Sequence, residues 1–388
     1  METRNSALAD SLGGESAAPS PAVREDRPAT PGRLGQADLV RAVAAVMVVA
    51  IHCLAWPAQA TGLAHLVYPA VGLLARVSVP LFVMLSGLLL AHSHPQPGPA
   101  KHFWAGRLRR TLVPWVLWAG VYFLLTVRFQ GMSPLPAQSW GWWAGGAGHL
   151  YFLILIPQLY LLYRVWPRSE WGAWLAMTLA VAVQLGMQFA RIMLPLHGGW
   201  GRALFLDYGF EEAPFWVGYF GIGVALGRSV ERIRWRGPLV WLAAALTAPA
   251  AALLLAGLPG KVAAHWGPWV NGTGAFLRPS LLLLTTLVFV DLWALGTVLE
   301  RWVGPLVQQG VRSLSRNSLG VYIIHPAFLL ASGPLLEGAP RPLSLQEPLP
   351  ESLLPLSVLV ATATSLGWAS SEVLGRWPLS RWTVGLGR

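Results

Sequence analysis

The chain has 388 residues, of which 54% are hydrophobic and only 12% are charged. A soluble domain carries about 25% charged residues, so this composition excludes an ordinary soluble protein and indicates a membrane protein with several spans. The net charge is +11, but the basic residues recur between apolar runs, which argues against a nucleic-acid partner. With a single cysteine there is no disulfide framework and no cysteine-based metal site, and we expect no bound metal.

Residues 1–36 are rich in Ala, Pro, Gly, Ser and charge and lack the pattern of a secretory signal, so we expect a disordered cytoplasmic tail. Residues 37–375 are expected to form one all-α transmembrane domain, followed by a short cytoplasmic tail over 376–388. Ten apolar segments are the expected membrane helices of this domain. They are 37–57, 69–92, 111–130, 147–166, 171–193, 213–228, 237–257, 274–299, 316–336 and 353–375.

The distribution of basic residues predicts the orientation of these segments. Most of the 28 Lys and Arg residues fall on one side of the membrane if the chain crosses it ten times with the N-terminus inside. We therefore expect both termini to be cytoplasmic, in a multi-pass protein that sits in a lipid bilayer. No internal repeat is present, so a transporter built from duplicated halves receives no support.

The first apolar segment carries two ionisable residues, Arg41 near one end and His52 near its middle. They are eleven residues apart, which is three helical turns plus about 20°, so both side chains share one helix face about 16 Å apart. The small residues Ala45 and Val48 lie between them on that face. A buried ionisable residue in a membrane helix usually marks a functional path. Histidine suits a general base near neutral pH, and arginine suits a phosphate group.

The next two segments add a polar break and a basic run. In VPLFVMLSGLLL, Pro80 is expected to break the helix, and Ser86 and Gly87 permit close approach of another backbone. In KHFWAGRLRRTLVPW, the basic residues include Arg107 and Arg110. They have two interpretations, ordinary anchoring on the inner side or a clamp for phosphate.

Two later segments contribute further histidines. The fourth opens with GHLYF, which places His149 at the outer membrane face, and the ninth contains SLSRNSLGVYIIHP, which places His325 about halfway across. His52 and His325 are then at similar depth on different helices, and we expect them to face one cavity. Pro157 and Pro326 lie inside spans, where they would kink the helices.

The longest outer connections are rich in tryptophan. The two interpretations are an interfacial aromatic belt and stacking of the indole rings on sugar. We take Trp142 as the candidate for a sugar contact. The tryptophans are Trp140, Trp142, Trp143, Trp200, Trp266 and Trp269.

A few other polar residues have weaker patterns. Cys53 follows His52 but points about 100° away from it, which disfavours a role as a thiol acyl carrier. Asp291 lies in the eighth segment, where an arginine is the expected partner. Glu211 and Glu212 lie outside the membrane, in a solvated loop or against a sugar.

Five motifs occur in a set order: Arg, ten residues and His in the first span; FVMLSG in the second; a basic run ending RLRRTLVPW; GHLYFL at the fourth; and LGVYIIHP near the end. In this the chain resembles the acyltransferase 3 family of integral membrane O-acyltransferases over about residues 37–375, closest to the branch that modifies bacterial surface polysaccharides. Leu88 stands where the family often has an aromatic residue, and Tyr151 stands where Trp is frequent. Both departures concern the acceptor site.

The resemblance implies a protein of the cell (inner) membrane, in which an acyl group, commonly acetyl, moves from cytoplasmic acyl-CoA to a hydroxyl of a glycan or lipid-linked saccharide outside. It implies that Arg41 and His52 are the essential pair. We expect His52 to act as the catalytic base or to carry the acyl group, and His325 to orient or assist it. The residues expected to bind the donor are Arg41, Ser86, Gly87, Arg107 and Arg110, and those expected to bind the acceptor are His149 and Trp142.

Two other classes of function remain as alternatives. A polysaccharide exporter or flippase would need a continuous polar path across the membrane, and intramembrane charge is sparse here. A membrane sensor or scaffold fits the topology but leaves Arg41 and His52 without a reason. The sequence leaves four points open. They are the identity of the acceptor, the acyl chain, whether transfer is direct or passes through an acyl-enzyme, and the oligomeric state, for which a homo-oligomer is one possibility.

Overall fold

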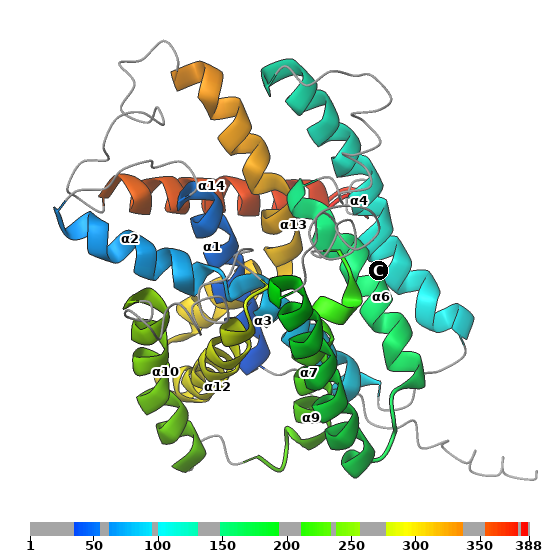
Figure 1. Cartoon of the computed structure of the whole chain (residues 1–388). Coiled ribbons are helices and arrows are strands. Elements are labelled where there is room, and N and C mark those ends of the chain that lie inside the picture. The colour runs from blue at the N-terminus through cyan, green and yellow to red at the C-terminus, as the bar shows by residue number, and fades with distance from the viewer. Residues whose placement is uncertain are drawn as a thin grey trace, which may run out of the picture. The chain divides into compact units, whose positions relative to one another are not determined.

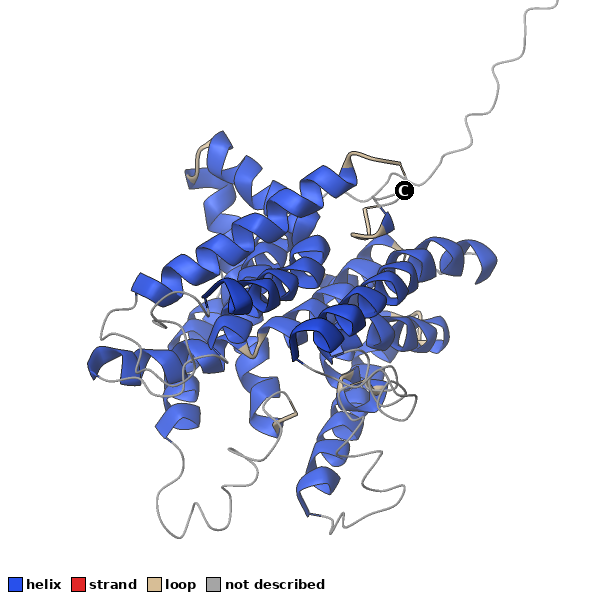
Figure 2. Cartoon of the chain, turned by 90° about the horizontal axis from the view of Figure 1, so that it is seen from above, coloured by secondary structure: helices blue, strands red, loops and turns tan. Residues whose placement is uncertain are grey.

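The structure is a computed structural model of the chain. It describes residues 35–54, 62–94, 100–130, 148–193, 211–233, 238–256, 277–336, 354–378 and 382–386. Within these ranges all regular structure is helical and no strand occurs (Figure 2), which confirms the all-α prediction. The predicted N-terminal tail lies outside the described residues, except that Gly35 and Gln36 open the first helix.

Each of the ten expected spans corresponds to helical structure in the described chain (Figure 1). The second one consists of two helices, α2 and α3. The elements are α1 (Gly35–Leu54), α2 (Gly62–Ala75), α3 (Ser78–Ser93), α4 (Ala100–Gln130), η1 (Gly148–Leu150), α6 (Tyr151–Val165), α7 (Glu170–Met193), η3 (Ala213–Phe215), α9 (Val217–Ser229), α10 (Pro238–Ala256), α12 (Pro279–Trp302), α13 (Pro305–Leu336) and α14 (Leu354–Gly375).

Six stretches of the described chain are long and apolar enough to cross a membrane, which confirms a polytopic membrane protein. α9 has 13 residues and is therefore about 20 Å long, too short to cross a hydrocarbon core of about 30 Å unaided. Helix α10 contributes the shorter apolar stretch Val240–Ala252, and α13 and α14 are not among the candidate spans of the described residues. The six stretches are Gly35–Leu54, Ala70–Ser93, Gly106–Arg128, Gly148–Val165, Glu170–Arg191 and Pro279–Trp302.

The break inside the second expected span comes before Pro80 and not at it. Helix α2 ends at Ala75, a turn follows, and α3 begins at Ser78. Pro80 is therefore in the first turn of α3, where a missing N–H removes no helical hydrogen bond. The expectation that Pro80 breaks the helix is wrong for this reason, because proline is tolerated at that position.

Helices α3 and α9 pack with their backbones in close approach. A β-carbon on Gly223 would overlap the carbonyl oxygen of Met84, and a β-carbon on Gly227 would overlap another backbone oxygen of α3. On the opposite side, a β-carbon on Gly87 would overlap a backbone oxygen of α9. Gly223 and Gly227 are four residues apart, the small-xxx-small spacing that brings membrane helices together.

Helices α1, α13 and α14 contact one another, and α14 crosses the other two in Figure 1. Near the start of α1, the buried carboxylate of Asp38 accepts a hydrogen bond of 2.7 Å from the Ser315 hydroxyl of α13. Near the end of α1, the Cys53 thiol is buried in an apolar contact among the three helices. Polar and apolar contacts therefore both hold α13 beside α1.

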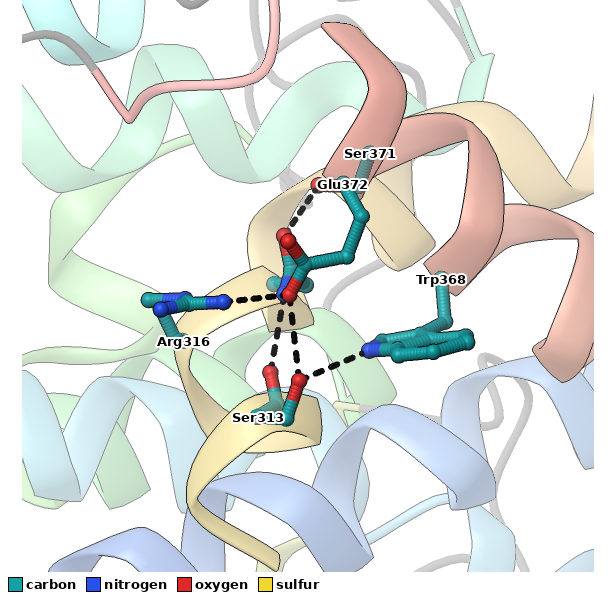
Figure 3. Close-up of polar contacts among 6 residues, drawn as sticks. Ser313, Arg316, Trp368, Ser371 and Glu372 are labelled. Atoms are coloured by element: carbon teal, nitrogen blue, oxygen red, sulfur yellow. Dashed lines mark hydrogen bonds and ion pairs between the residues drawn. The ribbon is translucent and has the colours of Figure 1, made fainter. Parts of the chain in front are cut away.

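A polar cluster joins α13 to α14 (Figure 3). Glu372 Oε1 accepts hydrogen bonds from Ser313 Oγ (3.1 Å) and from Asn317 Nδ2 (2.7 Å). The Asn317 side chain is 0% exposed, and its oxygen accepts a bond of 2.8 Å from Ser371 Oγ. The cluster therefore fixes the first half of α13 two turns before His325. Its members are Ser313, Arg316, Asn317, Trp368, Ser371 and Glu372.

Part of the expected C-terminal tail packs against the helices. Trp118 Nε1 of α4 donates a hydrogen bond of 3.0 Å to the Thr383 carbonyl oxygen. The guanidinium carbon of Arg109 lies 4.9 Å from the centroid of the Trp382 ring. Val384 is fully buried. This segment thus packs against α4 and contacts Arg109 of its basic run.

The segment before η3 holds a half-buried carboxyl group, Glu211. Gln158 of α6 fixes the backbone here, since its Nε2 donates to the Glu211 carbonyl oxygen (2.6 Å) and its Oε1 accepts from the Ala213 N–H (3.2 Å). Burial, and then repulsion from Glu212, raise the pKa of the Glu211 carboxyl from 4.5 to about 7. The sequence left two interpretations of Glu211, a solvated loop or a sugar contact. Because the carboxyl group is half-buried, Glu211 does not lie in a fully solvated loop.

We expect the free energy of unfolding to fall as the pH rises from 4.5 to about 7. The pKa of Glu211 is raised in the folded state, so between these values the folded protein holds a proton that the unfolded chain has lost, and this stabilisation disappears as the folded carboxyl ionises. Thermal unfolding of detergent-solubilised protein across this range measures the slope. Glu211→Gln should flatten it, while the same change at the exposed Glu231 should not; equal slopes in both variants would contradict the assignment.

Candidate active site

Histidines from α1 and α13 meet in the structure. His52 lies in the last turn of α1 (Gly35–Leu54). His325 is 0% exposed. The two ring centroids are 4.9 Å apart, and His325 Nε2 lies 3.0 Å from His52 Nδ1. Two residues that are 273 positions apart in the chain are thus in direct polar contact.

Two backbone carbonyls determine which nitrogens of these rings carry hydrogen. His52 Nδ1 lies 2.8 Å from the Val48 carbonyl oxygen, and His325 Nδ1 lies 2.9 Å from that of Val321. A carbonyl oxygen only accepts, so each Nδ1 is the donor, and in the neutral rings each Nε2 has a lone pair. His52 Nδ1–H is therefore shared between Val48 and the His325 Nε2 lone pair. His52 Nε2 is left as the basic nitrogen of the pair.

His149 is the third histidine of the cluster, and a glycine positions it. Gly148 has φ 67°, in the left-handed region, and opens the single turn of η1. The His149 ring centroid lies 5.9 Å from that of His52 and 6.0 Å from that of His325. The sequence predicted His149 at the outer membrane face as an acceptor contact. The structure places it beside the other two histidines, at the end of α1 that holds His52.

We expect Gly148→Ala to destabilise the protein by about 1–2 kcal/mol, because a β-carbon is strained at this backbone angle. It should also lower activity by displacing His149. Gly148→Asn is the matched control, since asparagine tolerates left-handed geometry better than alanine does. Thermal unfolding and turnover of both variants measure the effect. Equal losses in the two would show that the backbone angle is not the reason for the glycine.

Two tyrosines that the sequence analysis did not single out complete the cluster. The Tyr322 hydroxyl donates to the His149 carbonyl oxygen. The Tyr122 ring meets the His149 ring edge-on, with centroids 4.7 Å apart at 89°. Tyr322 is three residues before His325, a spacing that puts both on one helix face, so the motif held a signal for it. Tyr122 lies in no motif, and only the tertiary contact reveals it.

At the opposite end of α1, the expected donor-binding residues gather around Tyr160 of α6. The guanidinium carbon of Arg107 lies 5.8 Å from the Tyr160 ring centroid. The Tyr160 hydroxyl also faces the side chain of Ser86. Cationic groups and hydroxyls are the donors that bind phosphate oxygens. The arginines within electrostatic range of the Tyr160 hydroxyl are Arg41, Arg107 and Arg110.

The histidine cluster and the residues around Tyr160 are the same number of residues apart on α1 and on the η1–α6 segment. Arg41 and His52 are eleven residues apart, and so are His149 and Tyr160. Eleven helical residues span about 16 Å. His52 neighbours His149, and Arg41 is within electrostatic range of Tyr160, so the two segments run in opposite directions between the same two levels. A cationic end and an imidazole end therefore lie at the two ends of α1, and the η1–α6 segment contributes a residue to each.

Other residues singled out from the sequence lie elsewhere. Gly87 faces the backbone of α9, so packing accounts for it, and its predicted donor-binding role stays a prediction. Trp142 lies outside the described residues. Asp291 accepts a hydrogen bond of 2.6 Å from Thr247 Oγ1, so its partner within the described chain is a threonine of α10 instead of the expected arginine. Cys53 is 1% exposed and points away from the histidines into packed apolar groups.

The arrangement offers an imidazole nitrogen with a lone pair, a second histidine that accepts a hydrogen bond from the same ring, and a distant group of arginines. Such a constellation suits proton transfer at one end and anion binding at the other. In the part of the chain that the structure describes, no three His, Cys, Asp or Glu side chains are arranged to hold a metal ion.

Comparison with known proteins gives the chemistry. A family model described as an acyltransferase domain, that of acyltransferase 3, matches residues 34–371, an interval that contains both groups of residues. Among curated proteins and among solved structures, no match is found. The match covers most of the chain, in agreement with the motifs and their order. The chain belongs to the acyltransferase 3 family and is a multi-pass membrane acyltransferase.

Proposed function

We propose that this protein takes an acyl group, commonly acetyl in enzymes of this kind, from cytoplasmic acyl-CoA. It delivers the group to a hydroxyl of an extracytoplasmic glycan or lipid-linked saccharide at the cell (inner) membrane. The observation that carries the proposal is the pairing of Arg41 and Tyr160 at one level with His52 and His149 at the other. A long donor with phosphates at one end and a thioester at the other fits this polarity.

The arginines bind the donor in this proposal. Arg41, Arg107 and Arg110 come from two helices, and all three act electrostatically on the Tyr160 hydroxyl, so they place positive charge on this level of a largely apolar chain. Guanidinium groups bind phosphate with paired hydrogen bonds and keep their charge. Ser86, beside the same tyrosine, adds a hydroxyl to this group. The donor's thioester then extends along α1 toward His52.

His52 performs the chemistry in this proposal. Its Nε2 accepts the proton of the acceptor hydroxyl, the oxygen bonds to the thioester carbonyl carbon, and the C–S bond breaks. The departing sulfur takes the proton from the His52 imidazolium, so the products are an ester and a free thiol. His325 accepts a hydrogen bond from His52 Nδ1–H, which orients the ring and stabilises its charged form. In the route through an acyl-enzyme, the same Nε2 attacks the thioester first.

The test is acyl transfer with labelled acetyl-CoA. Membranes from cells that express the protein should place label in the glycan fraction, removable by mild alkali as an ester. Acid quenching during turnover separates the two routes, because only the acyl-enzyme route leaves label on the protein. A glycan fraction without label would overturn the proposal. Loss of surface glycan itself in cells lacking the protein would favour the exporter alternative.

A further inference from the structure

Tyr122 of α4 inserts its hydroxyl into the hydrogen-bond ladder of α13. The side chain is 2% exposed. Its hydroxyl donates to the Ile323 carbonyl oxygen (2.5 Å) and accepts from the Ala327 N–H (3.2 Å). In an uninterrupted α-helix these two backbone groups bond to each other, since they are four residues apart. The tyrosine hydroxyl therefore bonds to both backbone groups of one step in the ladder of another helix.

His325 and Pro326 lie between Ile323 and Ala327, the two residues whose backbone groups Tyr122 binds. Proline has no N–H, so the carbonyl four residues before it, that of Tyr322, also lacks its helical donor. Two successive steps of the α13 ladder are thus altered at the residues that carry the buried histidine. An inserted side chain is one of the few known causes of a sharp bend in a helix. The backbone direction at His325 accordingly depends on the Tyr122 hydroxyl.

The same tyrosine contacts His149. Its ring meets the His149 ring edge-on at 4.7 Å, and His149 Nε2 lies 3.4 Å from the Ile323 carbonyl oxygen that Tyr122 also binds. A carbonyl has two lone pairs, so it accommodates both donors. One side chain of α4 thereby contacts the backbone under His325 and the ring of His149.

We propose that Tyr122 is a positioning residue for the histidine pair: by holding open the Ile323–Ala327 step of α13, it sets the approach of His325 Nε2 to His52 Nδ1. This rests on the proposed function, in which His325 orients His52. The contact between the two rings is 3.0 Å long, so a small change in the bend of α13 weakens it. Tyr122 touches neither donor nor acceptor in this role.

The experiment compares Tyr122→Phe with Tyr219→Phe. Tyr219, in α9, is also fully buried, and Tyr219→Phe removes the same atom from a helix that carries none of the three histidines. For Tyr122→Phe we expect kcat with acetyl-CoA to fall about tenfold, the effect of one buried hydrogen bond, while KM changes less than about twofold. Hydrogen exchange of the peptide that spans residues 321–329 should become faster. Tyr219→Phe should change neither kcat nor this exchange.

Several outcomes would overturn the proposal. Faster exchange with unchanged kcat would mean that the hydroxyl only ties two helices together. Unchanged exchange would mean that the hydroxyl does not occupy the step. Equal losses of kcat in both variants would indicate general destabilisation. A wild-type protein that transfers no acetyl group would overturn the proposed function and the positioning role together. Faster exchange in Tyr122→Phe would then still show the helix contact, so the two failures are distinguishable.

Discussion

His52→Ala is expected to lower acyl transfer by about 10²–10⁴-fold, the usual contribution of a positioned general base. The His52 ring is the one whose Nε2 is left with a lone pair once its Nδ1–H is shared between Val48 and His325. His325 does not take over this task, because its own Nε2 faces His52. Turnover of labelled acetyl-CoA by the purified variant, with thermal unfolding as a check on folding, measures the loss.

Cys53→Ala is the matched control for His52→Ala. The two positions are adjacent, but the Cys53 thiol is buried among apolar residues of α13 and α14. We expect wild-type turnover within about twofold and a small loss of stability, since one buried sulfur is removed. Activity that survives in His52→Ala but is lost in Cys53→Ala would move the acyl chemistry to the thiol and contradict the site described here.

Gly223→Ala is expected to have the largest effect on stability, about 3 kcal/mol or more. The added β-carbon would meet the backbone carbonyl of Met84, and a backbone atom yields less easily than the end of a flexible side chain. Since native proteins are stable by only about 5–15 kcal/mol, such a loss should lower both the unfolding temperature and the amount of folded protein.

Gly186→Ala controls for the helix propensity of alanine in the Gly223 experiment. Gly186 lies in α7 with no atom within 4 Å of an added β-carbon. Alanine there should leave stability unchanged or raise it slightly, because glycine is the poorer helix former. If both variants lose the same stability, the close approach of α3 and α9 is not what requires Gly223.

Much of the candidate site could be predicted from the sequence because its signals are local. The eleven-residue spacing of Arg41 and His52 places both on one face of a helix whatever surrounds it. The GHLYF and YIIHP motifs likewise name His149 and His325. Which residues meet across helices is not a local property. The contact of His52 with His325 and the gathering of arginines at Tyr160 depend on packing between α1, α4, α6 and α13.

Two expectations from the sequence differ from the structure for identifiable reasons, and one residue of the site, Tyr122, had no signal in the sequence. Pro80 marks the start of α3 because the first turn of a helix needs no N–H from it. Asp291 lies against Thr247, since α10 and not a basic segment covers this part of α12. Tyr122 was overlooked because its role comes from a hydroxyl that reaches a different helix, and nothing in its own segment marks it.

The burial of Cys53 has a practical consequence for studies of this molecule in bilayers. It is the sole cysteine of the chain, and only 1% of its side chain is exposed. Maleimide or nitroxide reagents should therefore leave the native protein almost unlabelled. New cysteines placed one at a time can then carry a spin or fluorescent probe, and the separation of helices during turnover becomes measurable without first removing a native thiol.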